Sequence, residues 1–86
     1  MSEIEIGRVE DYFAHINVVA IEVNAEGIKV GDTLHFKGHT TDFSEKIISM
    51  QVDHKSVEEA PVGSDVGIKV KDRVRAHDHV FKVVED

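Results

Sequence analysis

The sequence predicts an all-β fold, a six-stranded antiparallel Greek-key barrel that closes on itself. First, apolar residues recur with a period of two in six separate runs, which is the spacing of strands that bury one face. Second, glycines and polar clusters separate these runs. Third, the chain has 86 residues and no cysteine, so a closed hydrogen-bond network has to support a thin core without disulfides.

Each expected strand is identified by its alternating apolar positions. The runs are rich in Val and Ile, which favour strands. The best helix-like stretch, residues 56–60, is short and is stopped by Pro61. The inward positions, in chain order, are Ile4 and Ile6; Val19, Ile21 and Val23; Leu34 and Phe36; Ile48, Met50 and Val52; Val66, Ile68 and Val70; Phe81 and Val83.

The connections between the runs are short and polar. Gly7 shifts the apolar phase by one residue, so we expect a β-bulge there. An open sheet of this size would expose its edges and its second face, whereas a barrel filled with side chains removes both problems. We therefore expect one β-barrel domain over residues 1–86 with no linker. The expected turns and loops are residues 24–27, 38–44, 61–64 and 75–78.

Composition places the chain in the globular class, with 41% apolar and 31% charged residues. No apolar run approaches the roughly 20 residues of a membrane-spanning helix. The acidic N-terminus is not followed by the apolar region of a secretory signal. The sequence thus predicts a cytoplasmic protein with no membrane partner.

Three segments carry a resemblance to a known family. They are Ile6-Gly7-Arg8-Val9, residues 28–38 with the turn Val30-Gly31-Asp32, and residues 47–70. Their order resembles the second, β-barrel domain of translational GTPases such as elongation factor Tu and initiation factor 2. The family's glycine-aspartate before the last strand is replaced here by His77-Asp78. The chain has no G-x-x-x-x-G-K-[ST] loop to hold phosphates, so no GTP binding is expected.

The resemblance implies a stand-alone, translation elongation factor-like binding module that contacts tRNA or ribosomal components. Catalysis and a cofactor are not expected from it. Similar barrels also occur as C-terminal appendages of collagenase-like peptidases and of RNA-modifying relatives. The alternative is therefore a protein-interaction or regulatory adaptor for a separately encoded peptidase or RNA-modifying enzyme. On that alternative, Ile16, Val18 or Ile47 would be exposed apolar contacts for the partner.

A basic row is the main candidate for RNA or partner binding. The formal net charge is −7, yet residues 61–82 hold five bases and three acids. The bases Lys69, Lys71, Arg73 and Arg75 stand at alternate positions and would share one face of an extended strand. Such a row could touch phosphates, or it could be an ordinary solvated strand face.

Tyr12 and Phe13 are the aromatic candidates, in the first connection. One of them caps the end of the core, or the pair offers an exposed platform for a base or a partner side chain. Among the six histidines, His77 and His79 lie two apart and are a weak alternative for a metal site, with no metal expected. No nucleophile motif or carboxylate pair suggests an enzyme.

Overall fold

The computed structural model describes residues 2–85, so Met1 and Asp86 of the expected 1–86 domain lie outside the described residues. Within that range the chain forms ten strands and no helix, which confirms the all-β class. The strands are β1 (Ser2–Phe13), β2 (Val18–Val23), β3 (Ile28–Lys29), β4 (Thr33–Lys37), β5 (Asp42–Lys46), β6 (Met50–Val52), β7 (Lys55–Val57), β8 (Glu59–Ala60), β9 (Asp65–Lys69) and β10 (His79–Val84).

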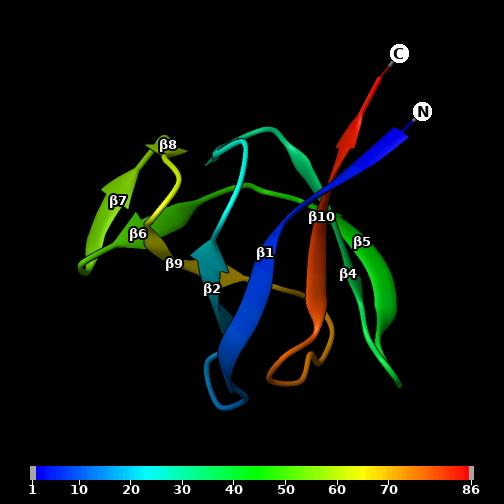
Figure 1. Cartoon of the computed structure of the whole chain (residues 1–86). Helices are drawn as coiled ribbons and strands as arrows, with labels where there is room; N and C mark the ends of the chain where they lie inside the picture. Colours follow the sequence, from blue (N-terminus) through cyan, green and yellow to red (C-terminus); the bar gives the residue numbers. More distant parts are fainter. Residues whose placement is uncertain (1, 86) are drawn as a thin grey trace.

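Eight of these strands form one antiparallel sheet in the order β5-β4-β10-β1-β2-β9-β6-β7, and β3 pairs with β8 in a separate ribbon (Figure 1). Ser2 pairs with Val84, so the two ends of the described chain lie side by side. No ladder joins β5 to β7 among the described residues. The expected six-stranded closed barrel is therefore wrong in strand number and in closure.

The sheet curves without closing, and one side chain of the edge strand β5 reaches the segment that follows β9, the third strand from the opposite edge. Glu45 on β5 accepts a hydrogen bond of 2.7 Å from the backbone N–H of Lys71, just beyond β9. β5 pairs with β4 on one side and with no strand of residues 2–85 on the other. The chain is irregular after Lys46, and the next strand, the three-residue β6, begins only at Met50. Of the additional strands, β3, β7 and β8 have two or three residues each, whereas β5 has five and overlaps the loop expected over residues 38–44.

Gly7 occupies the expected bulge. The pairing of β1 with β10 shifts register between Glu5 and Gly7, so Ile6 and Gly7 are buried in succession. A Cβ on Gly7 would lie 2.0 Å from the carbonyl oxygen of Glu22 on the neighbouring β2. The missing side chain at this position therefore lets the two strands approach closely.

The core lies on the inner face of the curved sheet, and two parts of it differ from the expected phase. Ile47 is buried, with 2% exposure, whereas Ile48 is 82% exposed. Val80 is fully buried in place of Phe81, which is half-buried. Both shifts follow irregular backbone, because Ile47 lies outside the strands and Val80 pairs with Gly7 at the bulge. The other large, fully buried side chains include Ile6, Val9, Val19, Ile21, Leu34, Phe36, Met50 and Val66.

The three apolar residues expected at a partner interface differ in their exposure. Ile16 is 50% exposed and Val18 is half-buried, but Ile47 belongs to the core, so its expected exposure is wrong. Nothing helical in residues 2–85 is long and apolar enough to cross a membrane.

Candidate functional site

The basic row does not form one strand face. β9 ends at Lys69, and the chain continues through residues 70–78 as turns and bends. Val70 and Val74 are buried along this segment, and the N–H of Val70 donates to the carbonyl of Asn17 at 2.9 Å. All four bases remain exposed, but only Lys69 lies in a strand. The row therefore divides into two surfaces.

The first surface holds Lys69 and Lys71 beside the most exposed large apolar residue of the described chain. We call this surface the Ile48 hollow, a depression of about 290 Å³. Its lining combines two ammonium groups, one carboxylate and two aliphatic side chains, so it is both apolar and basic. The lining residues are Glu45, Ile48, Ser49, Lys69, Val70 and Lys71.

The second surface brings Arg73 and Arg75 together with Tyr12, from the far end of the chain. We call it the Tyr12 hollow, a depression of about 540 Å³ lined by Asp11, Tyr12, Ala14, Arg73, Val74, Arg75 and Ala76. Asp78 organises the loop, because its buried carboxylate accepts the N–H of Arg75 at 2.9 Å. Tyr12 packs against the core while Phe13, at 40% exposure, faces outward. Two of the basic candidates and one aromatic candidate therefore meet.

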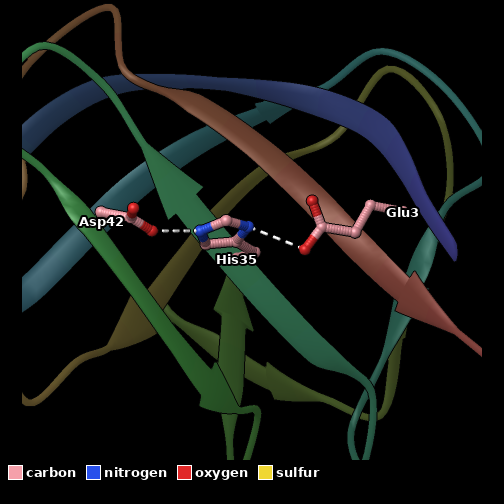
Figure 2. Close-up of polar contacts among 3 residues, drawn as sticks. All are labelled: Glu3, His35 and Asp42. Carbon is pink, nitrogen blue, oxygen red and sulfur yellow. Dashed lines mark hydrogen bonds and ion pairs between the residues drawn. The ribbon is translucent and has the colours of Figure 1, made fainter. Parts of the chain in front are cut away.

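A cluster that the sequence did not indicate lies on the outer face of β1, β10, β4 and β5. Figure 2 shows His35 between two carboxylates, with Nδ1 at 2.7 Å from Glu3 and Nε2 at 2.5 Å from Asp42. We call this arrangement the His35 clamp. Its three residues come from β4, β1 and β5, and they are brought together only by the strand register. The hydrogen bond with Asp42, followed by that with Glu3, raises the pKa of His35.

The same contact lowers the pKa of Asp42. Phe81 on β10 lies between the rings of His35 and His79, at centroid distances of 6.1 and 6.3 Å. Nδ1 of His79 is 2.5 Å from Glu5. The outer face of this half of the sheet thus carries paired imidazoles and carboxylates around one aromatic ring.

His77 and His79, the weak alternative for a metal site, have no third ligand group beside them within the described residues. His77 lies in a turn with a positive φ of 74°, and His79 is bonded to Glu5. Among residues 2–85, the group that could place three ligand atoms within 4.8 Å of one another is instead Glu10, Glu22 and Asp65, all exposed. A hydrogen bond with Asp65 raises the pKa of Glu10, with burial and the charges of Asp65 and Glu22 adding to the effect. The sequence carries no signal for this acidic group, because Glu22 and Asp65 come together only through the pairing of β2 with β9.

Comparison with known proteins points to proteases. The chain is 40% identical over 84 residues to an uncharacterized protease of Methanocaldococcus jannaschii, and this match covers 96% of the chain. It is 27% identical over 81 residues to a collagenase of Porphyromonas gingivalis, covering 93% of the chain. In both cases the chain spans about a fifth, 20%, of the relative's length. No model of a known protein family matches.

The fold has a counterpart among solved structures. The C-terminal domain of a Geobacillus thermoleovorans protein, described as a U32 peptidase, superposes with a TM-score of 0.86. The superposition covers 93% of this chain and 92% of that domain at 18% identity, so it establishes the fold alone.

The resemblance to the second domain of translational GTPases is therefore wrong, and so is the description as translation elongation factor-like. Both the relatives and the structural counterpart are proteases or peptidase domains. The motifs that suggested it are tight turns at Gly and Asp between alternating Val and Ile, which any small antiparallel sheet uses.

Proposed function

We propose that this chain is a non-catalytic adaptor domain of a U32-type peptidase, which binds the catalytic part of the enzyme. The observation that carries the proposal is the extent of the protease match. Nearly the whole chain aligns at 40% identity with only a fifth of a named protease. The remaining four fifths of that relative leave ample room for a separate catalytic domain.

The folded chain is consistent with such a role. Its structural counterpart is a C-terminal domain that was solved as a separate unit. The histidine and two carboxylates of the His35 clamp sit on an outward sheet face, whereas catalytic groups usually line a concave site. We therefore assign the surface of this domain to binding.

The test is a domain exchange in the M. jannaschii relative. One protein has its matching 84-residue segment replaced by this chain, and a second lacks the segment. We expect the exchanged protein to degrade gelatin at a rate close to the natural protein, and the shortened one to lose most activity. We expect the isolated chain to release no peptides.

Two results would contradict the proposal. Gelatin hydrolysis by the isolated chain would make it catalytic. Equal hydrolysis by the exchanged and shortened proteins, both folded by circular dichroism, would leave the domain without a role in the enzyme.

RNA contact is a second candidate function, favoured by the convergence of Tyr12, Arg73 and Arg75 on one hollow. Guanidinium groups bind phosphate and an aromatic ring can stack on a base. The net charge of −7 and the nearby Asp11 oppose this, so binding should be weak and strongly dependent on salt.

Fluorescence anisotropy with labelled tRNA at low salt tests this candidate. Replacing Arg73 and Arg75 by Ala should reduce affinity by about tenfold or more, given the loss of two phosphate contacts. Lys55→Ala, on the exposed edge strand β7, should change it little. No binding by the natural chain at low salt would eliminate RNA as a partner.

A further inference from the structure

The side chain of Ile48 faces solvent because the backbone of Ile47 is fixed by hydrogen bonds. The N–H of Ile47 donates to the carbonyl of Asp32 at 2.8 Å, and the carbonyl of Ile47 accepts from the N–H of Gly31 at 2.9 Å. These bonds fix the backbone while the Ile47 side chain enters the core at 2% exposure. Ile48, the next residue, is 82% exposed as a consequence. Its exposure is thus built into the connection between β5 and β6.

The surroundings of Ile48 give the exposed side chain a specific chemistry. Lys69 and Lys71 line the Ile48 hollow together with Val70. The one carboxylate there, Glu45, already accepts the N–H of Lys71 at 2.7 Å. Within residues 2–85, neither lysine ammonium forms an ion pair. An exposed aliphatic group therefore stands beside two unpaired positive charges.

Charge complementarity defines what this surface would accept. Residues 1–60 carry 12 acids and 5 bases, so most of the chain repels an acidic partner. The Ile48 hollow has the opposite sign. It matches a protein segment in which an apolar side chain is flanked by carboxylates, with the apolar group covering Ile48 and the carboxylates meeting Lys69 and Lys71.

We propose that the Ile48 hollow is the docking site for the catalytic part of a U32-type peptidase, through a segment that combines an apolar side chain with flanking carboxylates. The inference rests on the proposed adaptor function and assigns it a surface. The relatives support this choice of occupant, because four fifths of their length lies outside the match and is joined to the matching segment in one chain.

Cysteine labelling tests the assignment, because the natural chain contains no cysteine. Ile48→Cys is compared with Val62→Cys, a control at 55% exposure outside the Ile48 hollow. Each variant is made in the isolated chain and in the exchanged M. jannaschii protein. The rate of maleimide attachment is followed by mass spectrometry of the peptide that carries the new thiol. Thermal unfolding of both isolated variants should match the natural chain, because both positions are exposed.

We expect the thiol of the Ile48→Cys variant to react about tenfold or more slowly in the exchanged protein than in the isolated chain. The thiol of the Val62→Cys variant should react equally fast in both. Adding Lys69→Glu and Lys71→Glu should restore most of the reactivity at position 48 by repelling the partner's carboxylates. Lys55→Glu, an equal change of charge per residue on β7, should not.

Equal reactivity at position 48 in both proteins would overturn the assignment, and so would equal protection of the thiols at positions 48 and 62. Protection of position 48 in the isolated chain that grows with protein concentration would assign the hollow to a second copy instead. Protection by tRNA alone would assign it to RNA. Gelatin hydrolysis decides the adaptor function separately, since an exchanged protein that is active but leaves position 48 reactive would refute only the docking site.

Discussion

His35 is the residue whose chemistry depends most on its neighbours. In its protonated form both ring N–H groups donate to carboxylates, one to Glu3 and one to Asp42. Its side chain is 15% exposed, so water screens these contacts less than it would at a fully open site. The His35 clamp spans four strands of the sheet, because β10 and β4 lie between β1 and β5.

The His35 clamp should make stability depend on pH. Its hydrogen bonds raise the pKa of His35, so the folded chain keeps the imidazolium proton to higher pH than the unfolded chain. The stabilisation is complete below the unfolded pKa of about 6.5 and is lost as pH rises through the folded pKa. In urea titrations, we expect His35→Gln to cost about 0.5–1 kcal/mol near pH 6 and clearly less near pH 9.

His15→Gln is the matched control for that measurement, since His15 is exposed in the turn between β1 and β2. It should change the unfolding free energy by a similar, small amount at both pH values. A cost of His35→Gln that stays constant from pH 6 to 9 would mean that the imidazole contributes packing rather than charge.

Gly7 gives a second prediction at the level of one residue. Gly7→Ala places a Cβ 2.0 Å from the carbonyl oxygen of Glu22, so β1 and β2 would have to move apart. We expect a loss of about 1–3 kcal/mol in unfolding free energy, measured by urea or thermal denaturation. Gly67→Ala on β9 is the control, because its nearest contact would be an ordinary 3.6 Å. Equal effects of the two substitutions would refute the steric explanation.

Among the elements, the connection between β5 and β6 has the clearest division of roles. Ile47→Ala removes a core side chain and should cost about 2–5 kcal/mol in unfolding free energy. Ile48→Ala removes an equal volume from an exposed position and should stay within about 0.5 kcal/mol of the natural chain. Chemical denaturation of the two variants measures both. A larger loss of stability for Ile48→Ala than for Ile47→Ala would contradict the assignment of Ile47 to the core and Ile48 to the surface.

Strands with a clear alternation of apolar residues could be predicted from the sequence, whereas β3, β5, β7 and β8 could not. β2, β4 and β9 alternate Val, Ile, Leu or Phe with small or polar residues over five or six positions, and the alternation identifies their buried face. In β5, Phe43 is the one apolar residue among five, so the local sequence predicts a loop. It pairs because Phe43 stacks on Phe36 of β4, with ring centroids 5.2 Å apart. Tertiary packing, not local pattern, creates that strand.

The candidate sites show the same limit. Tyr12, Arg73 and Arg75 could be singled out by residue type, but their meeting in one hollow depends on a loop stabilised by Asp78. The His35 clamp cannot be inferred from the sequence pattern, because Glu3 lies 32 residues from His35 in the chain. Only the order of β1, β10, β4 and β5 in the sheet brings these groups together.

For the molecule as a whole, charge distribution limits which partners can bind. A formal charge of −7 arises mostly from residues 1–60, and the bases of residues 69–75 are concentrated on the Ile48 hollow and the Tyr12 hollow. An acidic or phosphate-bearing partner is therefore guided to two small areas and repelled elsewhere. This uneven field fits an adaptor that has to contact one partner in one orientation.

The same charge distribution predicts a solubility minimum on mild acidification. Protonation of the six histidines would take the formal charge from −7 to −1, and the raised pKa of Glu10 lets that carboxyl neutralise earlier than usual as pH falls. Near the isoelectric point, about 5.2, self-repulsion is weakest. We expect turbidity to rise between pH 7 and 5 while circular dichroism retains the β-sheet signal. Lys55→Glu makes the net charge more negative by two on β7 and should move the turbidity maximum to lower pH. Flat turbidity across this range, or an unchanged maximum in the variant, would show that net charge does not control association of this chain.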